Sequence, residues 1–112
     1  MKRSVFTYDP KNNRKILAGW IDEDKAIFFK EVTKSKHLLR VANAYAIQKD
    51  VFDKLKDEVA YVVILEKDTG MAYQASMEYW KTMGRDWEHG HGKQRILSVT
   101  YMYEFDKKKL DE

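Results

Sequence analysis

Two pairs of short apolar segments, each joined by a connector too polar for a core, constrain the fold of this 112-residue chain more than any other feature. Residues 16–21 and 26–32 are rich in Ile, Phe and Trp, and four charged residues separate them. Residues 60–65 and 71–75 form the second pair. Gly70, in their connector, can supply the positive φ that a type I turn with a bulge requires. The sequence therefore predicts two antiparallel hairpins.

A helical segment is predicted between the two hairpins. Residues 33–59 carry apolar side chains at spacings of three and four, and the pattern is most regular over residues 48–58. Residues 43–47 fit either a continued helix or an extended connector.

A second helix and a final strand complete the chain. Ser76 is a suitable N-cap for a helix over residues 77–83, and Gly84 is a suitable residue to end it. Residues 85–94 are polar and interrupted by glycine, so we expect a loop there. Residues 95–105 alternate between two faces, as in an amphipathic strand.

These elements predict one α+β domain over residues 1–112. We expect an antiparallel or mixed sheet of about five strands, made of two hairpins and a C-terminal strand, with two or three helices packed on it. Strict alternation of strand and helix is absent, which argues against a doubly wound parallel sheet. The ends of the chain, residues 1–14 and 106–112, are expected to fray.

The composition excludes several classes of protein. The chain has no cysteine, so disulfide scaffolds, zinc ribbons and thiol catalysis are ruled out. Its longest apolar run, residues 59–65, is far shorter than the ~20 residues of a membrane helix. Residues 1–13 lack the pattern of a signal peptide. We therefore expect a cytoplasmic protein with no membrane partner.

Charge is distributed unevenly along the chain, although the formal net charge is only +3. The isoelectric point of the sequence is about 9.0. Residues 30–49 carry a net charge of +4 and residues 81–95 a net charge of +2, whereas residues 50–68 carry −3. Segregated positive charge favours an anionic partner, so nucleic acid is the first partner class we expect.

The nucleic-acid hypothesis depends on two basic segments. In the first segment, Lys36 and Arg40 are four residues apart and on a helix would form one outward stripe of positive charge. An ordinary amphipathic helix has the same pattern. In the second segment, glycine amides and cations can hold a phosphate, and an exposed Trp87 can stack on a base. A tryptophan that covers the core is the competing interpretation. The candidate nucleic-acid-binding residues are Lys34, Lys36, Arg40, Arg85, Trp87, Lys93 and Arg95.

The same glycine-rich segment supports a catalytic alternative. His89 and His91 are two residues apart, so an extended backbone would project both to one side, where their nitrogens can hold a divalent metal. With Glu88 and Lys93 they would form the site of a small phosphodiesterase or nuclease. A zinc site needs at least three protein ligands, and the spacing secures only two. Solvent-facing histidines around a glycine turn are the competing interpretation.

A protein–protein interaction module is the third class. Such a module, for example an inhibitor or an assembly subunit, would present an apolar edge strand and could form a homo-oligomer. Tyr101, Tyr103 and Phe105 occupy alternate positions of the last predicted strand, which is typical of a base-stacking platform or, more often, of a core-facing strand. No catalytic or phosphate-loop motif is present. The function we expect is therefore that of a small, basic, non-catalytic domain without a cofactor, which associates with nucleic acid or with a nucleic-acid-handling complex.

Overall fold

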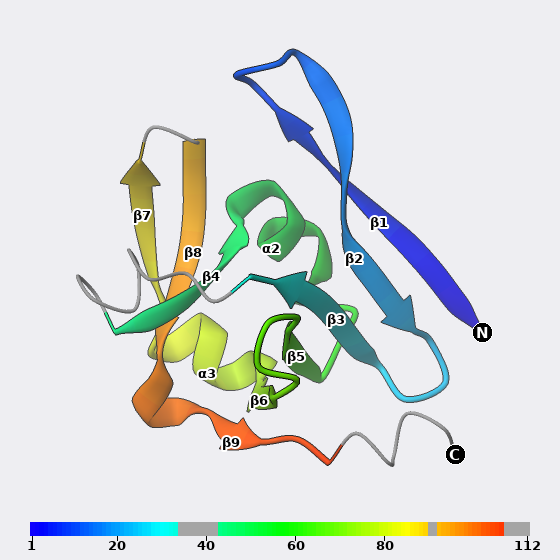
Figure 1. The fold of residues 1–112 in the computed structure, drawn as a ribbon, viewed down its shortest axis with the longest axis vertical. Helices are drawn as coiled ribbons and strands as arrows, with labels where there is room; N and C mark the ends of the chain where they lie inside the picture. Colours follow the sequence, from blue (N-terminus) through cyan, green and yellow to red (C-terminus); the bar gives the residue numbers. More distant parts are fainter. Residues whose placement is uncertain (34–42, 90–91, 107–112) are drawn as a thin grey trace.

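The computed structural model describes residues 1–33, 43–89 and 92–106, and these form two β-sheets and two short helices (Figure 1). The larger sheet has six strands in the order β1 (Lys2–Asp9), β2 (Arg14–Asp22), β3 (Ile27–Val32), β5 (Tyr61–Glu66), β6 (Ala72–Ser76) and β9 (Tyr103–Glu104). The smaller sheet has three strands in the order β4 (Ala44–Gln48), β8 (Gly92–Ser98) and β7 (Arg85–His89). The helices are α2 (Lys49–Leu55) and α3 (Met77–Thr82), and a 3₁₀ turn, η1 (Val99–Tyr101), follows β8. Within these residues, no helix is long and apolar enough to cross a lipid bilayer.

The predicted α+β class and the mixed sheet are confirmed, although the strands are more numerous than expected. Among the described residues, every strand pair is antiparallel except β3 and β5, which run parallel. The two predicted hairpins are β2–β3 and β5–β6, and Gly70 has a φ of 73° in the second connector. Ser76 caps α3 by accepting a hydrogen bond from the backbone N–H of Tyr79.

Residues 44–47 are extended as part of β4 rather than helical, because β4 is buried on both of its faces, and Asn43 before it has a φ of 49°. Tyr45 and Ile47 lie in the main core, while Ala44 and Ala46 pack with Ile96 of the paired strand β8 in a smaller apolar cluster. A segment that is apolar on both faces has neither the period of an amphipathic helix nor that of an amphipathic strand. Its pairing with β8 decides its conformation.

The loop predicted at residues 85–94 is instead the β7–β8 hairpin, within which the structure describes all residues except 90 and 91. The single strand predicted over residues 95–105 is also wrong. The side chain of Ser98 accepts the N–H of Thr100, and the chain turns there through η1. One alternating pattern therefore spans two strands, β8 and β9, that belong to different sheets.

The N-terminal residues differ from the expectation that residues 1–14 fray. All eight residues of β1 pair with β2, with a β-bulge between Val5 and Phe6. Thr7 donates a hydrogen bond from its hydroxyl to Asp50 at the start of α2, at 2.7 Å. The second half of β1 is therefore held against the helix as well as against its neighbouring strand.

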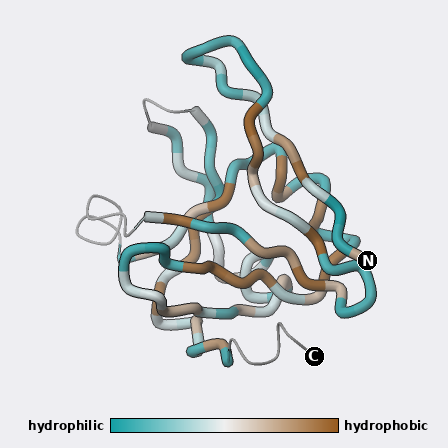
Figure 2. The backbone as a smooth tube through the Cα atoms, turned by 45° about the vertical axis from the view of Figure 1, so that its right-hand side comes forward, coloured by the Kyte–Doolittle hydropathy of each residue, from teal (hydrophilic) through white to brown (hydrophobic). Residues whose placement is uncertain are grey.

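Apolar side chains cover both faces of the larger sheet. In Figure 2 the segments made of hydrophobic residues lie toward the centre of the molecule. The main core lies on the helix side and contains Phe28 and the fully buried Trp80 of α3. On the opposite side, Phe29 stacks on Trp20 at 5.5 Å and meets Phe105 edge-on at 6.1 Å. The start of β3 is thus covered on both of its faces.

Two buried polar contacts join the sheets. The Tyr45 hydroxyl of β4 lies 2.5 Å from a Glu66 carboxylate oxygen at the end of β5, and burial together with this contact raises the pKa of Tyr45 well above its ordinary value. The Lys30 ammonium of β3 donates to the carbonyl oxygen of Ala46 in β4 at 2.7 Å. Burial lowers the pKa of Lys30 from 10.5 to about 8.

Lys30 should make the stability of the fold depend on pH between about 8 and 10.5. In this interval the unfolded chain keeps a proton on Lys30 that the folded chain has released, so the free energy of unfolding rises with pH. Urea unfolding of the wild type and of a Lys30→Met variant across this interval isolates the effect, because the other titrating groups are shared. We expect the wild type to gain more stability than the variant. Parallel pH profiles would contradict the assignment.

Candidate functional site

One face of the β7–β8 hairpin carries two pairs of opposite charges. The strand register places Asp86 opposite Arg95 and Glu88 opposite Lys93. Directly opposed charges attract each other across an antiparallel pair. This face therefore presents less positive charge than the sequence of the segment indicates, although both of its predicted nucleic-acid contacts, Lys93 and Arg95, belong to it.

Arg95 joins this hairpin to helix α3, and its side chain is only 15% exposed. Its Nε donates to the carbonyl oxygen of Trp80 at 3.0 Å, and its Nη2 donates to that of Lys81 at 2.9 Å. Its Nη1 donates to Asp86 at 3.0 Å, a contact that lowers the pKa of that carboxyl. The guanidinium also lies 4.9 Å from the ring centroid of Phe52. These contacts occupy the Nε, Nη1 and Nη2 donors of Arg95, which are the groups with which an arginine binds phosphate.

Gly84 leaves the space that this junction needs. A Cβ atom at this position would lie 2.2 Å from the carbonyl oxygen of Trp80 and 3.0 Å from Nε of Arg95. The glycine that the sequence assigns to the end of the helix is therefore required by close packing at the point where Arg95 docks.

Trp87 is packed rather than freely presented. Its partly buried ring lies against the small apolar cluster of Ala44, Ala46 and Ile96. The guanidinium of Arg85, which is exposed, lies 5.9 Å from the centroid of this ring. Of the two interpretations of Trp87, the structure favours a cover on the smaller sheet. Arg85 remains accessible on the surface.

Several of the predicted site residues fall outside the described parts of the chain. Lys34, Lys36 and Arg40 fall within residues 34–42, and His91 falls within residues 90–91. For His89 the backbone alone is described, and it pairs with Gly92. Across residues 1–33, 43–89 and 92–106, no group of three or more histidine or acidic residues is arranged to hold a metal ion.

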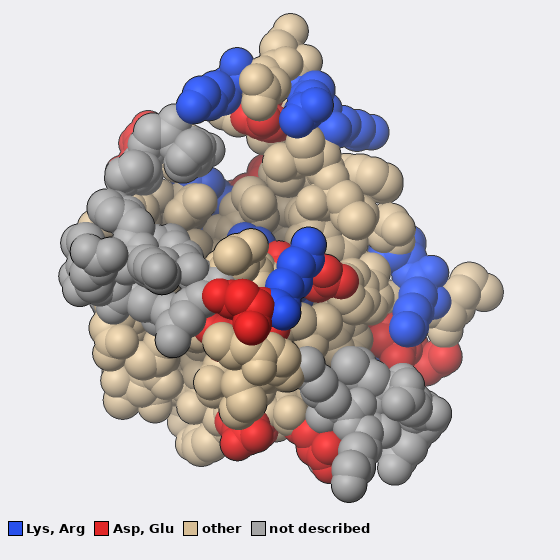
Figure 3. Space-filling view, viewed as in Figure 1, with Lys and Arg blue, Asp and Glu red and all other residues tan. Residues whose placement is uncertain are grey.

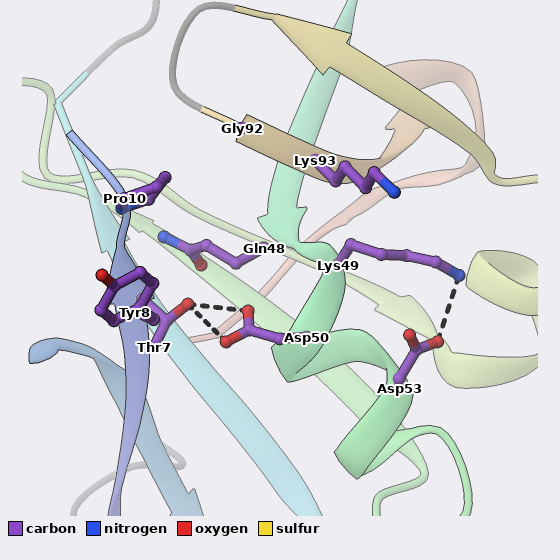
Figure 4. A pocket seen from close by; sticks show the side chains of 9 residues that line it. All are labelled: Thr7, Tyr8, Pro10, Gln48, Lys49, Asp50, Asp53, Gly92 and Lys93. Atoms are coloured by element: carbon purple, nitrogen blue, oxygen red, sulfur yellow. Dashed lines mark hydrogen bonds and ion pairs between the residues drawn. The ribbon is translucent and has the colours of Figure 1, made fainter. Parts of the chain in front are cut away.

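Two hairpins, β1–β2 and β7–β8, extend past the start of α2 on opposite sides (Figure 1). A cleft of about 330 Å³ lies between them, and Figure 3 shows the hollow below the tip of β1–β2. Figure 4 shows its walls coming from the second half of β1 with the turn after it, the end of β4, the first turn of α2 and the beginning of β8. The residues that line it are Thr7, Tyr8, Pro10, Gln48, Lys49, Asp50, Asp53, Gly92 and Lys93.

The carboxylates on the floor of this cleft are already engaged. Asp50 accepts the hydroxyl of Thr7 at 2.7 and 2.9 Å. Lys49 forms ion pairs with Asp53 at 3.1 Å and with Asp86 at 3.5 Å. Lys93, which is exposed on the β8 side, forms no ion pair with any described residue. The cleft therefore combines one acid–lysine pair, one carboxylate held by a hydroxyl, and Lys93, which forms no ion pair within the described residues although Glu88 lies opposite it across the hairpin.

The tip of the β1–β2 hairpin, next to Pro10 of the cleft wall, carries a second positive group whose residues do not line the cleft themselves. Lys11, Arg14 and Lys15 are exposed there and form no ion pair within the described residues, and Figure 3 shows Lys and Arg side chains gathered at this tip. Asp9 accepts hydrogen bonds from Asn12 and from the backbone N–H of Lys11. These contacts lower the pKa of Asp9, the amide of Asn12 contributing most. We call the three cations the tip cations.

The tip cations are not among the site residues predicted from the sequence, although the sequence carries a turn signal beside them. Pro10 and the two asparagines at positions 12 and 13 are turn-forming residues, and Asn13 adopts a φ of 50°. The segment after this turn, residues 16–21, is predicted as a strand from the sequence, whereas its pairing with residues 2–9 is seen only in the structure. The expectation of a frayed terminus removed these cations from consideration.

The arrangement can bind an extended anion. Cations lie on both sides of the cleft, at the tip of β1–β2 and at Lys93, while the carboxylates between them are held in internal contacts. Comparisons of the chain with protein-family models, with curated proteins and with solved structures find no match. The function is therefore inferred from these residues.

Arg95 and Arg85 should respond differently to substitution by alanine. Arg95→Ala removes three hydrogen bonds and the contact with Phe52, so we expect it to lower the free energy of unfolding by about 2 kcal/mol. Arg85→Ala removes an exposed side chain and should change stability by less than about 0.5 kcal/mol. Urea unfolding of both variants measures the difference. Equal stability of the two variants would show that the Arg95 contacts do not hold the hairpin to α3.

Proposed function

We propose that this protein binds nucleic acid, without catalysis, in the cleft between the β1–β2 and β7–β8 hairpins. The observation that carries the proposal is the charge arrangement: the tip cations and Lys93 lie on the two hairpins that flank the cleft and form no ion pair with a described residue. Of the two acids that line the cleft, Asp53 pairs with Lys49 and Asp50 accepts the hydroxyl of Thr7. A polyanion that lies between the hairpins contacts both cationic groups at once. Such contacts provide affinity through the release of counterions, with little dependence on sequence.

The side chains of the cleft supply contacts other than charge. Tyr8 is exposed and lines the cleft beside Pro10, so a ring is available there for a base to stack on. The Tyr8 hydroxyl is hydrogen-bonded to Asn13, which orients the ring relative to the tip. The Oε1 atom of Gln48 is buried in the wall of the cleft and has no hydrogen-bond partner among the described residues.

The nuclease alternative receives less support from the described residues. Asp50 and Asp53, the two carboxylates that line the cleft, are turned to Thr7 and Lys49 rather than to a common point (Figure 4). Glu88 lies opposite Lys93 in the hairpin register. A magnesium-dependent nuclease requires carboxylates that converge on the metal.

The tip cations should account for much of the binding, and the binding should weaken steeply with salt. A triple variant, Lys11→Ala with Arg14→Ala and Lys15→Ala, should lose at least tenfold in affinity for short labelled DNA. The slope of log affinity against log salt should fall by up to about 3. A mobility-shift titration at several salt concentrations measures both quantities.

A second triple variant is the matched control. Lys2→Ala, Lys67→Ala and Lys81→Ala remove the same charge from positions outside the cleft, and the last two cations already pair with Glu31 and Asp57. We expect this variant to bind nearly as well as the wild type. If both triple variants bind equally weakly, net charge rather than the cleft explains the binding. If the wild type does not bind, or binds independently of salt, the proposed function is wrong.

One observation favours self-association through β1 as a second function. β1 is the outer strand of the larger sheet, and Phe6 of β1 and Leu17 of β2, a cross-strand pair, are exposed together. The backbone groups along an outer strand can pair with another strand. In an antiparallel pair of two β1 strands related by a twofold axis, Lys2 of one copy can lie opposite Asp9 of the other. The β-bulge after Val5 interrupts this edge, which is why the interpretation ranks second.

Light scattering over a range of protein concentrations tests this second function. Self-association through β1 predicts a dimer that Lys2→Glu weakens, because the new carboxylate would then lie opposite Asp9. The substitution Lys67→Glu changes the charge equally at a position away from β1 and should leave the dimer intact. A monomer at every concentration, or equal weakening by both variants, would argue against the β1 contact.

A further inference from the structure

A second surface hollow lies where the end of β6 and the starts of β3 and β5 meet helix α3 and the segment through β9. This groove has a volume of about 740 Å³, within the range of small-molecule sites in proteins. It shares no lining residue with the cleft. The starts of β3, β5 and α3, the end of β6 and the segment through β9 form its walls, and its lining residues are Lys25, Ile27, Tyr61, Gln74, Ala75, Ser76, Tyr79, Tyr103 and Phe105.

Three tyrosines from separate elements surround this groove, and all three are exposed. The exposed fractions are 45% for Tyr61 of β5, 37% for Tyr79 of α3 and 64% for Tyr103 of β9. The ring of Tyr79 packs against the ring of Tyr101, with 5.4 Å between the two centroids. None of the three hydroxyls has a hydrogen bond to another described residue. Aromatic side chains gathered in this way, with polar ends left without partners, are typical of a recognition surface rather than of random exposure.

Polar groups in the groove complement the three rings. The hydroxyl of Ser76 accepts the N–H of Tyr79, so its own proton can be donated to a ligand. Gln74 offers an amide that can both donate and accept. Lys25 provides a cation, and no acidic residue is found among the described residues that line the groove. The chemistry therefore suits a ligand that combines a flat ring, polar ring edges and negative charge.

We propose that this groove binds the base of an unpaired nucleotide, with the rings of Tyr61, Tyr79 and Tyr103 as the stacking surface and Lys25 on the side of the phosphate. The proposal takes its ligand class from the proposed function but concerns a separate surface. Base–aromatic stacking tolerates any base, because every base has a flat face. The amide of Gln74 can add hydrogen bonds to the edge of the base.

Binding of small probes to the wild-type protein tests the ligand chemistry. In an NMR titration, adenosine 5′-monophosphate should shift the backbone signals of residues around the groove. Adenosine, which lacks the phosphate, should bind more weakly, and ribose 5-phosphate, which lacks the base, should cause no shift in the groove. If the nucleotide causes no shift there up to its solubility limit, or if ribose 5-phosphate binds equally well, the proposal is overturned.

Variants at Tyr103 separate the ring from the hydroxyl. Tyr103→Ala should weaken binding of adenosine 5′-monophosphate roughly five- to hundredfold, because it removes a stacking ring, whereas Tyr103→Phe should retain most of the affinity. Phe6→Ala removes an exposed ring of β1 that is not part of the groove and should have no effect. Equal affinity of Tyr103→Ala and the wild type would overturn the stacking role. If a short apolar peptide binds the groove and the nucleotide does not, the surface is a protein contact and the proposal is wrong.

The triple variant of the tip cations distinguishes the two sites. It should bind adenosine 5′-monophosphate in the groove as the wild type does, even though it binds DNA weakly. If the nucleotide shift persists while the wild type shows no salt-dependent DNA binding, the groove proposal stands and the proposed function of the cleft fails. If DNA binding depends on the tip cations but the nucleotide leaves the groove signals unchanged, the opposite holds.

Discussion

The burial of β4 on both of its faces is the constraint on which the rest of the architecture depends. Tyr45 and Ile47 lie in the main core, and Ala44 and Ala46 pack against Ile96 of β8 and Trp87 in the smaller cluster. An apolar strand covered on both sides joins the smaller sheet to the larger one. The Tyr45–Glu66 contact and the bond from Lys30 to the Ala46 carbonyl satisfy polar groups at this junction, which would be costly to bury alone. Since α2 begins directly after β4, the same junction places the floor of the cleft.

The charge of the cleft follows from which side chains the fold uses internally. Asp50 holds β1 against α2 through Thr7, and Asp9 closes the turn of the first hairpin. Arg95 is a cation like those at the tip, but its guanidinium donates to backbone carbonyls of α3. The folded structure therefore pairs acids and cations unevenly, and the tip cations and Lys93 form no ion pair with a described residue.

The cleft and the aromatic groove differ in the physical basis of the recognition that we propose for them. Contacts between phosphate and the lysines or arginine of the cleft are weakened by salt, since they release counterions. Stacking on Tyr61, Tyr79 and Tyr103 depends on contact area and is less sensitive to salt. The two surfaces occupy different parts of the molecule and share no lining residue, so their contributions can be measured independently.

Local sequence patterns determined the elements that carry their own signals: the hairpins β2–β3 and β5–β6, the glycine of the second turn, the helix start at Ser76 and the regular part of α2. These signals are local because turns, caps and amphipathic periods involve residues close together in the chain. Only the tertiary structure decided that β4 is extended, that residues 85–98 contain a hairpin, and that Arg95 serves packing while the tip cations stay exposed at the turn of the β1–β2 hairpin. The conformation of a segment that is apolar on both faces, and the availability of a charged side chain, depend on partners distant in the sequence, which a local pattern does not contain.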